Sequence, residues 1–273
     1  MKIATAIFLS GIVWANAAEK FETLRQEPAP HMTRADIHYV ETVKNPKAVL
    51  VLCPGVNGNG EGLIRSRKWI EFAKANQLGL VGLSFASPIS TINDGTGYYY
   101  VENGSGELLL KGLRKIFGRD LPLLLYGTSG GAHFTSRFVE WNPKRVLTWT
   151  AYSAGWWDEP EKSGVTPPGI VACGDEDHRY GASLIYFKQG RAAGKPWLWV
   201  SLPRTGHTGS SELDQFVMSY FAAILQNRSG DPAFLDIDRK VVVSEAEAQT
   251  YPSLTAWLPT QKLLDEWRAI HGQ

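Results

Sequence analysis

The stretch LLLYGTSGG, from Leu123 to Gly131, decides which fold this chain adopts. Its first four residues are apolar, as in a buried strand, and Phe134 and Phe138 follow at the spacing of one face of a helix. Ser129 therefore occupies the turn between a strand and a helix, with glycines two positions before and after it. Side chains at those glycine positions would collide with the strand and the helix, so the pattern predicts a nucleophile elbow that exposes a reactive serine. The alternative is a glycine-rich turn without chemistry, or one that binds an anion.

Apolar runs recur along the chain at the intervals of β-α-β units. Several, such as residues 49–52 and 123–125, are apolar without alternation, which is typical of strands covered on both faces. The pattern predicts an α/β fold with three α/β/α layers, in which helices cover both faces of one mostly parallel central sheet. The predicted strands are residues 37–43, 48–53, 78–85, 121–126, 146–152, 169–173 and 197–202.

On these residues the chain resembles the α/β-hydrolase family. Members of that family carry a nucleophile, an acid and a histidine in that chain order, with the acid after the second strand beyond the elbow and the histidine after the last strand. Here the run 169–173 leads into Asp175, Glu176 and Asp177, and the run 197–202 leads into His207. The resemblance implies that the elbow serine attacks an acyl carbon, that the histidine moves its proton, and that an acid orients the imidazole.

The acid and the base each have competitors in the sequence. We predict Asp177 as the acid, because it stands three positions after Gly174 and so resembles the family's G-x-x-D turn. Asp175 is the alternative, although an acid there would more often cap or brace the turn, and Glu176 ranks below both. His207 is favoured among the six histidines because it follows the last predicted strand and has glycines beside it. The remaining histidines, which we interpret as structural, are His31, His38, His133, His178 and His271.

Acyl transfer also needs two backbone amides that stabilise the oxyanion. The resemblance assigns the first to Gly130, whose amide begins the helix after the serine. The second is expected from the loop after the second predicted strand, where family members commonly have His-Gly and this chain has Pro54-Gly55. Proline has no amide to donate, so Val56 is the predicted donor and Asn57 the alternative. An ordinary turn that only shapes the pocket is the interpretation without chemistry.

Aromatic residues near the predicted site are candidates for contact with the substrate. A long loop between residues 85 and 106 contains three consecutive tyrosines, of which we expect Tyr98 and Tyr99 to face the substrate, with packing against the sheet as the alternative. Trp156, after the strand that follows the elbow, is a similar candidate, and Asn57 is also assigned to substrate binding. The segment 156–168 is too short for a helical lid. We therefore expect an open cleft that suits a bulky or polymeric acyl substrate.

Residues 1–17 have the order of a secretory signal peptide. Lys2 is followed by the apolar run 3–14 and then by Ala15-Asn16-Ala17. The run is shorter than the span of about 20 apolar residues that a bilayer requires. We expect cleavage after Ala17 and a soluble product that is secreted or periplasmic. A buried first strand or an uncleaved anchor is the alternative.

The charge balance and the spacing of potential ligand residues limit the partners that we expect this chain to bind. The 273 residues carry 28 Lys+Arg and 27 Asp+Glu, a balance that does not favour nucleic acid or an anionic membrane surface. No metal-ligand spacing and no nucleotide fingerprint is present, so we expect neither a metal nor a cofactor. By the resemblance, Cys53 and Cys173 lie about 14 Å apart, too far for a disulfide, and two buried free thiols are predicted. We expect a monomer, with residues 18–226 as the catalytic domain and residues 227–273 as a tail docked on it.

The resemblance implies a secreted serine hydrolase that acts on small or polymeric carboxylic esters, similar to lidless esterases and to polyester or feruloyl-type depolymerases. Two other functions stay open. One is a peptidase that resembles the catalytic domain of the prolyl oligopeptidases, although the propeller that gates those enzymes is absent. The other is a catalytically silent protein that binds carbohydrate or peptide through the aromatic loop. Fold alone does not choose among the three.

Overall fold

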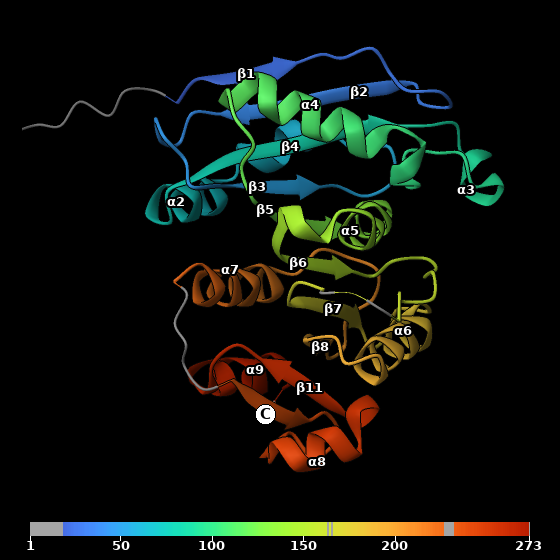
Figure 1. The fold of residues 1–273 in the computed structure, drawn as a ribbon, viewed down its shortest axis with the longest axis vertical. Helices are drawn as coiled ribbons and strands as arrows, with labels where there is room; N and C mark the ends of the chain where they lie inside the picture. Colours follow the sequence, from blue (N-terminus) through green and yellow to red (C-terminus); the bar gives the residue numbers. More distant parts are fainter. Residues whose placement is uncertain (1–18, 163, 165, 227–231, 273) are drawn as a thin grey trace, which may run out of the picture.

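One eight-stranded sheet runs through the middle of the computed structural model, which describes residues 19–162, 164, 166–226 and 232–272 (Figure 1). In order across the sheet, the strands are β1 (Phe21–Leu24), β2 (Arg34–Val40), β4 (Leu78–Ala86), β3 (Ala48–Cys53), β5 (Leu123–Thr128), β6 (Val146–Tyr152), β7 (Gly169–Gly174) and β8 (Trp197–Leu202). The two pairs at one edge, β1 with β2 and β2 with β4, are antiparallel, and all the other neighbouring strands pair in parallel. The predicted α/β class with a mostly parallel sheet is therefore confirmed.

The seven predicted strands all form, and β3, β6 and β8 have the predicted bounds. The strand predicted at residues 37–43 is β2, which begins and ends three residues earlier. Its start at Arg34 alternates half-buried and buried residues, so a search for continuous apolar runs misses it. The helices and 3-10 turns of the main body are α1 (Gly60–Ile64), α2 (Arg67–Ala75), α3 (Thr91–Asp94), η1 (Val101–Asn103), α4 (Ser105–Phe117), α5 (Gly130–Trp141), η2 (Pro143–Arg145), α6 (Tyr180–Ala192) and α7 (Ser211–Leu225).

Helices cover both faces of the sheet, as two adjacent residues of β5 show. The ring of Tyr126 packs against Trp69 of α2, and its hydroxyl donates to Asp214 of α7. Gly127 faces α5, because a Cβ placed on it would lie 2.7 Å from Thr135 Oγ1. Successive strand residues point to opposite faces of a sheet. Helices α2 and α7 therefore lie on one face and α5 on the other.

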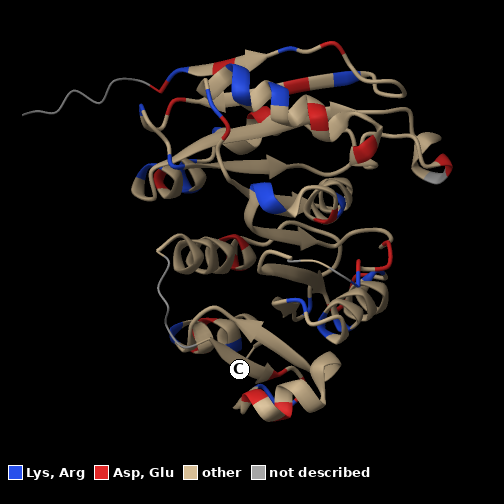
Figure 2. Ribbon diagram, in the orientation of Figure 1, with Lys and Arg blue, Asp and Glu red and all other residues tan. Residues whose placement is uncertain are grey.

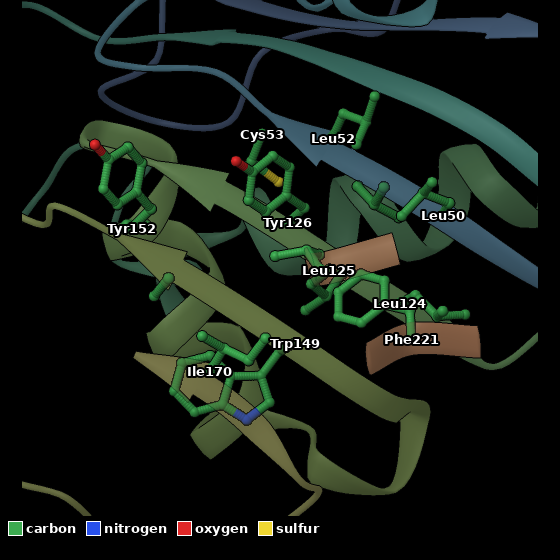
Figure 3. Packing of buried hydrophobic residues seen from close by; sticks show 14 of the residues in the cluster. Leu50, Leu52, Cys53, Leu124, Leu125, Tyr126, Trp149, Tyr152, Ile170 and Phe221 are labelled. Carbon is green, nitrogen blue, oxygen red and sulfur yellow. The ribbon is translucent and has the colours of Figure 1, made fainter. Parts of the chain in front are cut away.

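The hydrophobic core follows the predicted pattern. Leu124 and Leu125, adjacent in β5, are both fully buried, so this strand is covered on its two faces (Figure 3). Side chains of β3, β5 and β6 lie side by side there, and Phe221 of α7 packs among them. The helical face predicted at Phe134 and Phe138 is buried in α5, and α7 likewise buries Leu213, Phe216, Val217, Tyr220 and Phe221.

Residues 232–272 form a small sheet and short helices that pack beyond β8 (Figure 1). The indole Nε1 of Trp267 donates to the backbone oxygen of Trp199 at 2.8 Å, and Arg191 Nε donates to that of Thr255 at 2.7 Å. The final helix buries Trp267 and Ile270, and most of the small sheet is not apparent from the sequence pattern. The elements are β9 (Ala233–Asp236), β10 (Val241–Val243), α8 (Glu245–Thr250), η3 (Pro252–Leu254), β11 (Thr255–Leu258), η4 (Gln261–Leu263) and α9 (Leu264–Ile270).

The cysteines and the charged residues lie in the structure as the sequence analysis predicts. Cys53 and Cys173 are buried free thiols on strands three spacings apart, as predicted, and burial raises the pKa of both. Figure 2 shows acidic and basic residues interspersed over the elements. Within the described part of the chain, no helix combines the length and the apolarity that crossing a bilayer requires. The predicted signal peptide, residues 1–17, lies outside the described residues.

Candidate active site

Ser129 stands where β5 ends and α5 begins, in a backbone conformation that projects its side chain. Its φ of 54° and ψ of −116° lie in a sparsely populated region, which costs a residue with a Cβ about 1–3 kcal/mol. The turn is tight enough to require glycine on either side. A Cβ on Gly127 would lie 2.2 Å from the oxygen of Gly131, and a Cβ on Gly131 would lie 2.1 Å from the oxygen of Cys53. The strained turn therefore holds the serine hydroxyl clear of the strand.

A continuous chain of hydrogen bonds joins this serine to a buried carboxylate. Ser129 Oγ lies 3.0 Å from His207 Nε2, and His207 Nδ1 lies 2.8 Å from Asp177 Oδ2. The three side chains follow β5, β8 and β7, whose carboxyl ends meet at one edge of the sheet. Because the carboxylate accepts a hydrogen bond from Nδ1–H, the proton stays on Nδ1 and Nε2 is left free to accept the proton of the serine hydroxyl. The arrangement can therefore activate the serine for attack on an acyl carbon.

The Asp177 side chain is fully buried and is nevertheless held as a carboxylate. Burial raises its pKa, but hydrogen bonds from His207 and from Arg179 outweigh burial and hold the pKa at about 2. The backbone N–H of Arg179 donates to Oδ1 at 3.1 Å, and its guanidinium donates to the same oxygen at 3.0 Å. Oδ2 is thereby left to His207. Arg179 was not identified from the sequence; its position two residues after the acid is the only signal that could have found it.

The other candidate acids lie outside this chain of hydrogen bonds. Asp175 is exposed, and its Oδ1 accepts from the backbone N–H of Thr205 at 3.3 Å, so it braces the turn as an alternative interpretation of the sequence suggested. Glu176 is also exposed. Among the described residues, neither acid has a hydrogen bond to His207.

Three of the other histidines are buried in structural positions. His133 on α5 accepts from the backbone N–H of Gly155 at 2.9 Å, and burial lowers its pKa to about 3, so its ring is neutral. His38 bonds to Ser84 on the neighbouring strand, and His271 accepts from the backbone N–H of Ser201 in the tail contact. The exposed histidines, His31 and His178, have no hydrogen bond to Ser129 among the described contacts.

Two backbone amides meet beside the serine. Residues 55–58 form a tight turn, in which Gly58 N donates to Gly55 O at 2.9 Å and Asn57 has the positive φ of 53° that a type II turn needs. The turn lies against the start of α5, because a Cβ on Gly130 would be 2.6 Å from Val56 N. Within the described part of the chain, neither Val56 N nor Gly130 N donates to a protein acceptor. Two unengaged amides beside a serine hydroxyl are the arrangement of an oxyanion hole.

The serine opens into a shallow depression of about 370 Å³. Among the described residues that line it there is no Asp, Glu, Lys or Arg, and Val56 adds an apolar side chain that is 43% exposed. None of the described residues between β6 and β7 forms a helix, so no helical lid is built from them. The residues that line the depression are Gly55, Val56, Gly58, Thr128, Ser129, Tyr152, Ser153, His207, Thr208 and Gly209.

Comparison with known proteins bears on the fold. No protein-family model matches the chain, and no curated protein sequence matches it. Solved structures do match. A poly(3-hydroxybutyrate) depolymerase, LpqC, from Bordetella parapertussis superposes with a TM-score of 0.57 at 17% identity, covering 86% of this chain and 94% of that one. The chain has the α/β-hydrolase fold.

Two further matches to this α/β-hydrolase fold have similar scores. S-formylglutathione hydrolase (FrmB) from Staphylococcus aureus gives a TM-score of 0.58 at 14% identity, covering 79% of this chain and 100% of that one. A fungal esterase from Rhizomucor miehei gives 0.59 at 12% identity, covering 77% and 83%. The expected relation to the α/β-hydrolases therefore holds for the fold.

Three of the residues assigned to substrate contact are placed otherwise by the structure. Tyr99 is fully buried and Tyr98 is 5% exposed, because both rings pack with Phe85 and His133 inside the molecule. The prediction of a substrate-facing tyrosine wall is therefore wrong. The prediction for Asn57 is wrong as well, since its amide group is occupied by the backbone of another loop, described below.

Trp156 is half-buried and stacks on His133, with ring centroids 3.6 Å apart. It does not line the depression at Ser129, and its contact with substrate stays a prediction.

Sequence reasoning missed Tyr152 and Ser153, which do line the depression at Ser129. Both stand at the carboxyl end of β6, the neighbour of β5, and that topological position is the signal that could have found them. Across the described residues, no group of three or more side chains suits a metal ion.

Replacing Val56 by proline is expected to lower kcat by about 100- to 1000-fold, if the depression hosts acyl transfer. Proline removes the amide hydrogen without requiring another turn, because the first central position of a type II turn accepts proline. The matched control is Val56→Ala, which keeps the amide and loses only the exposed side chain. Steady-state kinetics on one ester would compare them. Equal rates for V56P and V56A would mean that the Val56 amide does not stabilise the oxyanion.

Proposed function

We propose that this α/β-hydrolase is an exported serine hydrolase that cleaves carboxylic esters through an acyl-enzyme on Ser129. The observation that carries the proposal is the continuous hydrogen-bonded chain from Asp177 through His207 to a strained, exposed serine. The unengaged amides of Val56 and Gly130 beside that serine support it. Export rests on the signal-peptide pattern of residues 1–17.

The proposed reaction has two steps. Ser129 Oγ forms a bond to the acyl carbon while its proton passes to His207 Nε2, and the resulting oxyanion accepts hydrogen bonds from the two amides. The carbon–oxygen bond to the alcohol then breaks, and the histidine returns the proton to the leaving alkoxide. Water attacks the acyl-enzyme with the same histidine as base, releasing the acid and the free serine. Throughout, the carboxylate of Asp177 stabilises the imidazolium.

The shape of the depression supports a bulky or polymeric ester. It is shallow, and glycines and small hydroxyl residues form much of its lining. A free carboxylate or ammonium group on the substrate has no charged partner in its lining. The matched structures include one named a poly(3-hydroxybutyrate) depolymerase and others named esterases. A neutral ester, either aryl or part of a polyester chain, is therefore the proposed substrate class.

The test combines a substrate panel with covalent labelling. The panel contains p-nitrophenyl esters of increasing acyl length, a feruloyl ester, a short polyester and an aminoacyl-proline anilide. We expect turnover of esters and no turnover of the anilide, and a fluorophosphonate should label the protein on Ser129 alone. Anilide turnover without ester turnover would favour a peptidase. A protein that neither turns over any member nor reacts with the fluorophosphonate would be a silent binding protein. Amino-terminal sequencing of the protein recovered from an export-competent host tests cleavage after Ala17.

A further inference from the structure

We infer that Arg34 is a positioning residue that aims the Val56 amide at the reacting acyl oxygen, an inference that rests on the proposed ester hydrolysis. Arg34 begins β2, and its side chain crosses the end of β4 to the turn that follows β3. Its Nη2 donates to Asn57 O at 2.9 Å and to Gly58 O at 2.8 Å, and its Nε donates to Ser84 O at 3.0 Å.

The planarity of two peptide units links the position of the Arg34 guanidinium to the direction of the Val56 N–H. In a planar trans peptide the C=O and the N–H point in opposite directions. Arg34 holds the oxygen of Asn57, so the N–H of the same peptide, on Gly58, points the other way and donates to Gly55 O at 2.9 Å. The oxygen of Gly55 is thereby turned toward Gly58, and the N–H of its own peptide, on Val56, points away from the turn. Two peptide units thus link the guanidinium to the oxyanion donor.

A second clamp holds the same turn against β4. The Asn57 side-chain amide donates to Ser87 O at 2.9 Å and accepts from Ser87 N at 3.0 Å, which fixes the residue that carries the positive φ. Asn57 is therefore engaged on both its main chain and its side chain. This explains why it is not free to contact substrate, and why the turn can keep its shape with Pro54-Gly55 where family members commonly have His-Gly.

Arginine is suited to this task because its planar fork offers donors in a fixed geometry, and charge-assisted bonds to carbonyl oxygens are stronger than neutral ones. A lysine at position 34 would keep the positive charge but would lack the planar set of donors that binds several oxygens at once. Loss of the guanidinium leaves the turn free to move by a fraction of an ångström to an ångström, a displacement that can cost about 100-fold in rate. The effect should fall on the transition state, since the oxyanion forms only there.

The experiment compares Arg34→Gln and Arg34→Lys with the wild-type protein and with Arg119→Gln. Arg119 is a matched control because its Nη2 donates to the backbone oxygen of Pro46 at 2.8 Å, in the loop that precedes β3 at the opposite end of the strand. We expect R34Q to lower kcat between about 10-fold and about 100-fold with KM nearly unchanged, R34K to fall between R34Q and wild type, and R119Q to leave kcat unchanged. The inhibition constant of an aryl boronic acid, which forms a tetrahedral adduct on the serine, should rise by the same factor as kcat falls.

Hydrogen exchange of the amides of residues 55–60 supplies a readout that does not depend on turnover. These amides should exchange faster in R34Q than in R119Q while exchange elsewhere in the sheet is unchanged. If R34Q keeps the wild-type kcat, or if its kcat falls while boronic acid affinity is retained, the inference is overturned and ester hydrolysis stands. If the wild-type protein turns over no ester, the proposed function fails. Unchanged exchange of residues 55–60 in R34Q would then separately overturn the positioning of the turn.

Discussion

Replacing Ser129 by alanine should lower kcat on the best ester of the panel by about 10⁶-fold. The reason is that this hydroxyl is the group that would form the covalent bond, and its oxygen lies 3.0 Å from His207 Nε2. Alanine keeps a Cβ and hence the same backbone strain, so the fold and the neighbouring amides should be unchanged. The residual rate should come from the oxyanion donors and from binding alone.

The measurement needs a matched serine and a separate check of the fold. Ser136 serves as the control because it lies on the same helix as the elbow and donates to the backbone oxygen of His133, away from the depression. S136A should keep the wild-type rate, and both variants should keep the thermal midpoint of the wild-type protein. The fluorophosphonate should label S136A and fail to label S129A. An S129A protein that hydrolyses esters at a rate comparable to wild type would place the nucleophile elsewhere.

The part of this site that could be predicted from the sequence is the part fixed by local chemistry. The elbow needs small residues at Gly127 and Gly131, and that requirement is visible without a structure. Asp177 and His207 follow apolar runs whose carboxyl ends must meet in a parallel sheet, so their approach to the serine follows from topology. The central strands could also be predicted, because a strand that is buried on both faces must be apolar along its whole length.

What could not be predicted depends on contacts distant in sequence. Arg34 reaches the turn at residues 55–58 only because β2 and β4 pair, and nothing near residue 34 in the sequence marks it. Tyr98 and Tyr99 have hydroxyls and could serve a cleft or a core, and the packing of the loop against β4 and α5 placed them in the core. The short edge strand β1 lacks an apolar run because it is half-exposed. In each case tertiary packing, not local propensity, set the outcome.

The second large effect is expected from Asp177→Asn, which should lower kcat by about 10⁴-fold. An asparagine can present either its oxygen or its NH₂ group to the histidine, and the surroundings decide which. Both donors of Arg179 bind the Oδ1 position, so the amide oxygen must stay there to accept from them. The NH₂ group therefore occupies the Oδ2 position and donates to His207 Nδ1, which moves the ring proton to Nε2. In that tautomer the imidazole cannot accept the proton of Ser129.

Asp175→Asn supplies the control, because it makes the same chemical change two residues away, on a carboxylate that braces the turn through Thr205. Its kcat should stay close to wild type. A double variant, D177N with His207→Ala, should be no slower than H207A alone, since an acid that acts only through the histidine has nothing to orient once the imidazole is gone. A loss in D175N that equals the loss in D177N would mean that the turn, and not one carboxylate, supports the histidine. Additive losses in the double variant would give Asp177 a role independent of His207.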